Sequence, residues 1–248
     1  MNIVVCISSV PDTTSKISFT ENSSKFDNSG IQFVINPYDE FGLTKAMMLK
    51  EKTAGNVIVI TVGDVSVEAV MRKALAIGAD SAIRINAKPT DSYFTAIAIS
   101  NYLKENPADL IIAGRESIDY NGGAVGGMIA EMMNLPFVNA CNGLEIDGNT
   151  AKLSREIDGG KENLSANLPL VIGGQKGLVE ESDLRIPNMR GIMQARSKPL
   201  IVVEPSSDEN LTSSENFEKP AEKSACKLVE VGNEAELVSL LQSEAKVI

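Results

Sequence analysis

Apolar runs and amphipathic segments alternate along the chain from its first residues to about residue 203. The apolar runs show no polar alternation, which is typical of parallel strands covered on both faces. They occupy residues 2–9, 57–62, 82–85, 110–113 and 200–203. Apolar side chains spaced three and four apart predict helices over residues 37–54, 65–78, 93–106 and from 124 onward. The alternation predicts an α/β fold with a doubly wound, mostly parallel sheet.

The helix expected after residue 36 carries clear start and stop signals. Asn36 suits the N-cap. Pro37 suits the first helical position, because the N–H that proline lacks would have no hydrogen-bond partner within the helix there. Asp39 places a negative charge in the first turn, where the helix dipole favours it. Gly55 is expected to end this helix.

The region after residue 135 is richer in β signals. Two turn sequences, Asp-Gly-Asn at 147–149 and Asp-Gly-Gly at 158–160, predict hairpins. The first turn lies within an expected hairpin over residues 143–157. The second lies between residues 150–157 and a further expected strand over 163–173. Residues 175–196 are polar and are expected to form a loop, and residues 14–30 an excursion or hairpin. The predicted fold therefore has a β-rich C-terminal part.

An extended C-terminal arm follows. Residues 206–224 are poor in apolar side chains, so they cannot bury enough surface to fold alone and are expected to form a linker. Residues 234–245 place leucines on one face of a short amphipathic helix. That helix either folds back on this chain or reaches over a partner subunit. We expect an α/β domain over residues 1–205 and an arm over 206–248.

A glycine-rich loop joins the strand at 110–113 to the helix from 124. The geometry of strand, glycine-rich turn and helix N-terminus directs backbone N–H groups and the helix dipole toward an anion. Gly114, Gly122 and Gly123 allow close backbone approach, because glycine has no Cβ. The sequence matches neither GxGxxG nor the P-loop pattern. A tight connection that binds nothing gives the same local pattern.

Composition excludes several classes of protein. The net charge of −10 offers no basic stripe for a phosphate backbone, so nucleic acid is not an expected partner. The absence of histidine excludes Ser-His-Asp and Cys-His catalysis within this chain. Cys6, Cys141 and Cys226 have no metal-binding spacing and are expected to be reduced thiols. With no signal peptide and no apolar run approaching ~20 residues, we expect a cytoplasmic protein that does not insert into a membrane.

Ordered motifs along nearly the whole chain resemble the β subunit of electron transfer flavoprotein. They are VPDT at 10–13, NPYDE at 36–40, ALAIGAD at 74–80, GRESID at 114–119, REIDGGKE at 155–162, LP at 168–169 and IMQARSKP at 192–199. Each motif is short, but their common order is specific. The chain is identified as a member of this family.

The resemblance implies a heterodimer that carries electrons. In the family, the α subunit holds the redox FAD, and the β subunit cradles that domain and carries a structural AMP. The complex takes electrons from acyl-CoA dehydrogenases in fatty acid β-oxidation and passes them to a membrane quinone oxidoreductase. This subunit is then an electron-carrier component without catalytic residues or a metal. We expect it to contact the α subunit, the dehydrogenases and the electron transfer flavoprotein–quinone oxidoreductase.

The resemblance also assigns site residues. Tyr38 occupies the position where the family places an aromatic side chain near the α-subunit flavin. The expected cofactor-binding positions are Cys6, Asn36, Pro37, Tyr38, Asp39, Val62, Gly114, Arg115, Glu116, Ser117, Ile118, Asp119, Asn121, Gly122, Gly123, Ala124 and Val125. Packing in the core and a simple capping turn are the alternative roles for Cys6, Val62 and Tyr38.

A recognition loop is expected at about residues 175–196, docking on dehydrogenases by an exposed apolar side chain. The resemblance puts this anchor at or near Met189, with Ile186 as the competing position. Arg190 and Ile192 belong to the same docking segment. A flexible apolar side chain suits docking on varied partners.

Two other functions stay open. Some family members bifurcate electrons and hold a second FAD, reduced by NADH, in place of AMP. Ala124 stands where the family usually has glutamine, which leaves the nucleotide's identity open. A stand-alone nucleotide-binding sensor protein on a similar sheet is the second alternative.

Overall fold

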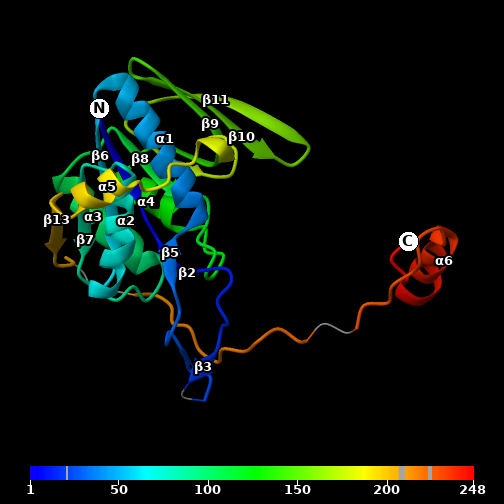
Figure 1. The fold of residues 1–248 in the computed structure, drawn as a ribbon. Coiled ribbons are helices and arrows are strands. Elements are labelled where there is room, and N and C mark those ends of the chain that lie inside the picture. The colour runs from blue at the N-terminus through cyan, green and yellow to red at the C-terminus, as the bar shows by residue number, and fades with distance from the viewer. Residues whose placement is uncertain (21, 207–209, 223–224) are drawn as a thin grey trace.

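The computed structural model describes residues 1–248 except 21, 207–209 and 223–224. Its main sheet has nine strands in the order β11-β10-β9-β12-β8-β1-β6-β7-β13 (Figure 1). The strands are β1 (Asn2–Cys6), β6 (Asn56–Val62), β7 (Ser81–Ile85), β8 (Leu110–Gly114), β9 (Phe137–Asp147), β10 (Thr150–Ile157), β11 (Gly160–Asn167), β12 (Leu170–Gly174) and β13 (Leu200–Val203). The parallel strands β6, β7 and β13 lie on one side of β1, and the parallel strands β8 and β12 lie on the other. The predicted α/β, doubly wound and mostly parallel sheet is confirmed.

Helices cover both faces of this sheet. They are α1 (Pro37–Thr53), α2 (Glu68–Ile77), α3 (Ser92–Glu105), α4 (Val125–Met133) and α5 (Met189–Ala195). Successive side chains of a strand point to opposite faces. Ile3 and Val5 accordingly pack in a core with α1 and α2, whereas Val4 and Cys6 pack in a second core with α3 and α4. Because β1 is buried on both faces, its run of apolar residues has no polar alternation.

Two small sheets lie beside the main one. β2 (Ser9–Pro11) pairs with β5 (Phe33–Ile35), and β3 (Phe19–Thr20) pairs with β4 (Lys25–Phe26) as the expected hairpin excursion. A short 3-10 helix, η1 (Val65–Val67), precedes α2. The first strand expected over residues 2–9 is therefore two strands, because Ser9 leaves the central sheet and pairs with Ile35 instead.

Three expected element boundaries were wrong. The strand expected over residues 163–173 is β11 followed by β12, because Pro169 lacks the N–H that would continue a ladder. The loop expected over residues 175–196 contains η2 (Glu181–Asp183) and α5. Ala54, with φ of 52°, takes the left-handed position at the end of α1 that was expected at Gly55. Gly55 is needed for another reason, because a Cβ there would lie 2.6 Å from the Met1 carbonyl oxygen.

The C-terminal arm leaves the body and ends in α6 (Glu234–Leu240) and η3 (Leu241–Ala245), a turn of π-helix. Figure 1 shows this end in red, away from the sheet. Leu237 and Val238 of α6 are both exposed. The linker expected over residues 206–224 includes positions 207–209 and 223–224, which lie outside the described residues. Within the described ranges, no helix has both the length and the apolar character needed to span a bilayer.

Candidate functional site

A cavity of about 490 Å³ opens at the carboxyl ends of β1, β6 and β8. These strands surround the point where the strand order reverses, which is where open α/β sheets bind ligands. The walls come from residues 6–9 at the end of β1, residues 61–64, 66 and 67 at the end of β6, residues around the start of α3, and parts of the segment 113–126 between β8 and α4. Its volume falls within the range of about 300–1,000 Å³ that is usual for small-molecule sites.

The N-terminus of α4 faces this cavity without a side-chain cap. Ala124 is the N-cap residue and makes no side-chain capping hydrogen bond. Val125 and Gly126, in the first turn, line the cavity. The first N–H groups of a helix have no partner within the helix, and the dipole adds positive potential there. This end of the cavity is therefore suited to an anion such as phosphate.

The charged part of the lining is mainly acidic. Lys88 is the one cationic side chain among the described lining residues. The carboxylates are those of Asp39, Asp64, Asp91, Glu116 and Asp119. Carboxylate oxygens only accept hydrogen bonds when ionised, so they suit the hydroxyl groups of a sugar and repel additional negative charge.

Asn36 and Asp39 connect α1 to the cavity loop. Asn36 Nδ2 donates to Asp39 Oδ1 at 3.1 Å and to the Glu116 carbonyl oxygen at 2.9 Å. Asn36 Oδ1 accepts from Ile118 N at 3.3 Å. Asn36 is at the N-cap of α1 as expected, but its side chain does not cap the helix, because these partners occupy both of its polar atoms. It fixes the loop that follows β8 instead.

Burial controls the ionisation of two cavity residues. Burial raises the pKa of Asp39 to about 7, although hydrogen bonds from Ser8, Asn36 and Gly114 favour its charged form. Burial, and then the neighbouring Asp39, raise the pKa of Cys6 to about 12. A thiol that stays protonated at neutral pH is a poor nucleophile. Cys6 therefore contributes packing, not chemistry, to the cavity.

A second cavity, of about 520 Å³, lies between Tyr38 and the loop that follows β12. Arg115 Nη1 donates to Gln175 Oε1 at 3.2 Å, and Gln175 Nε2 donates to Glu156 Oε2 at 2.9 Å. This chain of contacts joins the loop after β8, the loop after β12 and strand β10. Tyr38 and Arg115 are thus placed in a different cavity from Asp39 and Gly114.

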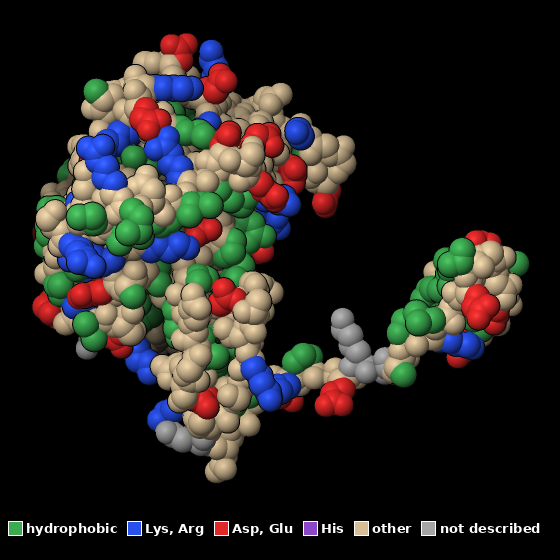
Figure 2. All heavy atoms as spheres, in the orientation of Figure 1, with side chains coloured by type: hydrophobic (Ala, Val, Ile, Leu, Met, Phe, Trp, Pro, Cys, Tyr) green, Lys and Arg blue, Asp and Glu red, His purple; other side chains and the backbone are tan. Residues whose placement is uncertain are grey.

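An exposed apolar surface surrounds α5. The exposed fractions are 84% for Ile186, 77% for Met189 and 70% for Met193. Figure 2 shows hydrophobic side chains beside lysines and arginines over the part of the body where α5 lies. Gly191 allows close packing on α2, because a Cβ there would clash with the Ala76 carbonyl oxygen. The helix thus turns its apolar side chains outward while its backbone lies against α2.

A family model described as the electron transfer flavoprotein domain matches residues 24–208. The chain belongs to the electron transfer flavoprotein family. It is 36% identical over 264 residues to electron transfer flavoprotein subunit beta of Bacillus subtilis, covering 100% of both chains. It is 33% identical to the subunit beta of Syntrophomonas wolfei, covering 91% of this chain and 88% of that protein. The subunit beta of Mycobacterium bovis is 34% identical over 82% of this chain and 78% of its own length.

The structure of this flavoprotein subunit brings many of the expected site residues together. Those that line the first cavity are Cys6, Asp39, Val62, Gly114, Glu116, Ser117, Asp119, Gly122, Gly123 and Val125. Others lie outside its lining, namely Asn36, Pro37, Tyr38, Arg115, Ile118, Asn121 and Ala124. Of these, Asn36 acts through hydrogen bonds to the loop, and Ala124 leaves the helix end uncapped.

Sequence reasoning missed three parts of the cavity. Thr61 lies near the carboxyl end of β6, and Gly63 and Asp64 follow that strand, so the rule that ligands gather at strand carboxyl ends points to them. Residues 88–92 precede α3 and follow β7, so the same rule applies. Thr212 and Ser214 come from the C-terminal arm, where no local pattern announces a binding role.

Proposed function

We propose that this electron transfer flavoprotein β subunit pairs with an α subunit and binds AMP in the cavity beside α4. The observation that carries the proposal is the uncapped N-terminus of α4, which opens into that cavity. A phosphate there would accept hydrogen bonds from the first-turn N–H groups, such as those of Val125 and Gly126. Lys88 adds a single positive charge.

The charge balance of the cavity favours a single phosphate. Four lining carboxylates, not counting Asp39 with its raised pKa, and one lysine make a second phosphate group costly, because like charges repel strongly where water is excluded. Asp64 can accept hydrogen bonds from ribose hydroxyl groups. Val62 and Ile99 give an apolar wall for a base. These features support AMP over a second FAD, whose pyrophosphate carries more negative charge.

The second cavity is the proposed contact with the α-subunit FAD. FAD, held mainly by the α subunit, supplies the redox chemistry of the heterodimer. Tyr38 offers an aromatic ring at this cavity, and Arg115 offers a cation that Gln175 orients. This subunit therefore helps to position the flavin. The two cofactors occupy separate cavities on either side of the Asn36–Asp39 cluster.

The α5 surface is the proposed docking site for acyl-CoA dehydrogenases. Met189 and Ile186 are its most exposed apolar side chains, and Arg190 and Ile192 lie beside them on the same segment. Electrons then pass from the dehydrogenase to the FAD and on to the quinone oxidoreductase, in fatty acid β-oxidation in the cytoplasm. The arm over residues 206–248 packs on the α subunit, which would cover the exposed apolar side chains of α6.

Nucleotide analysis of the heterodimer tests the proposal. The chain is co-expressed with its α subunit, and the nucleotides released by denaturation are identified and counted. We expect one FAD and one AMP per heterodimer. Two FAD and no AMP would instead establish the bifurcating type, with NADH as reductant. A stable nucleotide-bound monomer from this chain alone would favour the stand-alone sensor.

A matched pair of lysine variants locates the AMP. Lys88→Ala removes the cavity's cation and is expected to lower AMP occupancy, because the phosphate loses its charged partner. Lys104→Ala is the control, since Lys104 lies on α3 outside the cavity lining and contacts only Asn101 Oδ1 at 3.5 Å among the described polar groups. Equal occupancy in the two variants would place the nucleotide elsewhere.

A further inference from the structure

The C-terminal arm is fastened to the body beside the proposed AMP cavity. Asp91 Oδ2 accepts hydrogen bonds from Leu211 N at 2.8 Å, Thr212 N at 2.8 Å and Thr212 Oγ1 at 3.2 Å. The other oxygen of Asp91 accepts from Phe94 N at 2.7 Å and caps α3. One carboxylate therefore both starts α3 and holds the arm.

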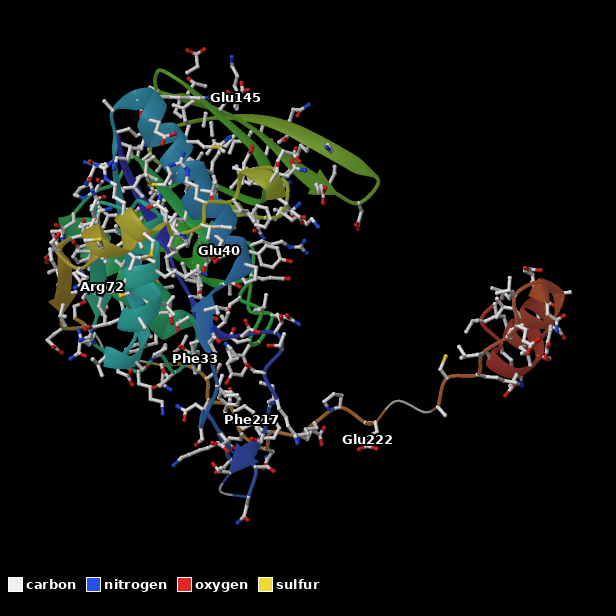
Figure 3. The ribbon with its side chains drawn as sticks, in the orientation of Figure 1. Phe33, Glu40, Arg72, Glu145, Phe217 and Glu222 are labelled. Carbon is white, nitrogen blue, oxygen red and sulfur yellow. The ribbon has the colours of Figure 1, made fainter. Side chains whose placement is uncertain are left out.

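A second attachment follows a few residues later. Phe217 N donates to the Ser23 carbonyl oxygen at 2.7 Å, and the Phe217 ring stacks on Phe19 with centroids 5.3 Å apart. Figure 3 shows Phe217 beside the β3–β4 hairpin, where the arm passes the body. Thr212, in the first attachment, and Ser214, between the two attachments, line the cavity. The strap, defined as residues 211–217, thus runs from α3 past the cavity to the hairpin.

The composition of the strap indicates that specific contacts hold it against the body. It is polar and has little apolar surface to bury, so nonspecific collapse does not hold it against the body. Its position depends on specific contacts instead, namely three donors on one carboxylate oxygen and one aromatic stack. Hydrogen bonds to an ionised carboxylate are stronger than those between neutral groups.

The strap adds two hydroxyl groups to the lining of the cavity. The lining is rich in carboxylates, which do not donate to a phosphate when ionised. Ser214 brings a neutral hydroxyl that can donate without adding negative charge, whereas Thr212 donates its hydroxyl hydrogen to Asp91 and keeps an oxygen that can accept from a ribose hydroxyl group. Both come from the C-terminal arm, whereas the other lining residues lie within residues 6–126.

We propose that the strap completes the nucleotide site, so that Thr212 and Ser214 contact bound AMP and the Asp91 attachment must open for AMP to leave. Asp91 is a positioning residue in this scheme, because it acts through the strap. The inference rests on the proposed occupancy of this cavity by AMP. It adds the C-terminal arm to the binding site and makes the arm a control point for nucleotide release.

AMP exchange in the full heterodimer tests the inference. Isotopically labelled AMP is bound, chased with unlabelled AMP and followed by filtration, and association is measured separately. Asp91→Ser keeps a capping hydroxyl for Phe94 N but removes the carboxylate that holds the strap. Thr212→Val with Ser214→Ala removes the two hydroxyls and retains the backbone attachment. Asp12→Ser is the matched control, since Asp12 accepts from Thr14 N and Oγ1 in a turn outside the cavity lining.

We expect Asp91→Ser to release AMP about tenfold faster, which corresponds to about 1.4 kcal/mol, with an unchanged or faster association rate. The hydroxyl variant should also release AMP faster, and the Asp12→Ser control should match the parent protein. Slower AMP association with Asp91→Ser would indicate a collapsed cavity and would overturn the inference. A rate of AMP release from Asp91→Ser within twofold of the parent rate would overturn it as well. Failure of the parent heterodimer to bind labelled AMP would refute the proposed function itself, and the inference with it.

Discussion

Arg72 and Lys198 lie 126 residues apart in the sequence, yet Arg72 Nη1 donates to the Lys198 carbonyl oxygen at 2.8 Å. The same nitrogen donates to the Ala195 carbonyl oxygen at 2.7 Å. Lys198 Nζ in turn donates to the carbonyl oxygens of Leu75 and Ala79 at the end of α2. These reciprocal contacts fasten the C-terminal end of α5 to α2 (Figure 3 labels Arg72).

Loss of the Arg72 contacts should loosen the proposed docking surface. Arg72→Met removes two charge-assisted hydrogen bonds and should cost about 2 kcal/mol of stability. It should also slow flavin reduction by an acyl-CoA dehydrogenase, because α5 loses its fixed position. Thermal unfolding and dehydrogenase-coupled reduction measure the two effects. Lys73→Met is the control on the same helix, since its ion pair with Glu40 is partly exposed and is expected to contribute no more than about 1 kcal/mol.

Docking by the α5 surface should depend on Met189. Truncation to alanine removes an exposed apolar anchor and should raise the KM for the dehydrogenase about tenfold, as at interface hot spots that cost about 1.4 kcal/mol. The flavin content should stay unchanged, because Met189 lies outside both cavities. Val65→Ala is the control at a similarly exposed valine far along the chain from α5. A larger rise in KM with Ile186→Ala than with Met189→Ala would show that Ile186 is the main anchor.

Much of the sheet could be predicted because its strands are marked by local composition. The runs at β1, β6 and β8 are apolar without alternation, since these strands are buried on both faces. The glycine-rich loop before α4 was also predictable, because close backbone approach requires glycine at Gly114. The strands depend on residues that are neighbours in the sequence, whereas the clash that requires glycine at position 114 is with Asn36, Tyr38 and Asp39.

The missed features depend on distant partners. Asn36 was expected to cap α1, but its side chain binds Asp39 and the loop some 80 residues later. The helix α5 was missed because it has seven residues and directs several apolar side chains outward, which gives no amphipathic pattern toward a core. The bond from Thr212 to Asp91 joins residues 121 apart, and neither local sequence indicates it.

Gly114 should be intolerant of any side chain. A Cβ there would clash with Asp39 Oδ1 and would lie 3.0 Å from both Asn36 Nδ2 and Tyr38 Cβ. Gly114→Ala should therefore displace the Asn36–Asp39 cluster, cost about 1–3 kcal/mol and lower AMP occupancy. Nucleotide content and urea unfolding measure these losses. Gly160→Ala is the control, because a Cβ at Gly160 meets nothing within 4 Å; losses of equal size in the two variants would contradict the clash.

Asp39 should make stability depend on pH. Its pKa is about 7 in the folded protein and ordinarily 3.8, so between about pH 4 and pH 7 only the unfolded chain has released the proton. The free energy of unfolding should therefore fall as pH rises through this window, by about 1.4 kcal/mol per pH unit from this group. Asp39→Asn removes the titration, so any stability advantage of the parent should be largest at low pH and shrink toward pH 7.

Urea unfolding of the heterodimer at several pH values between about 5 and 8 measures this difference between parent and variant. Asp12→Asn is the control, because hydrogen bonds from the Thr14 hydroxyl and backbone lower the pKa of Asp12, and its titration lies below the window. Parallel pH dependences for the parent and Asp39→Asn would show that Asp39 is ionised throughout. In that case the donors from Ser8, Asn36 and Gly114, and not burial, would determine the charge of this carboxyl group.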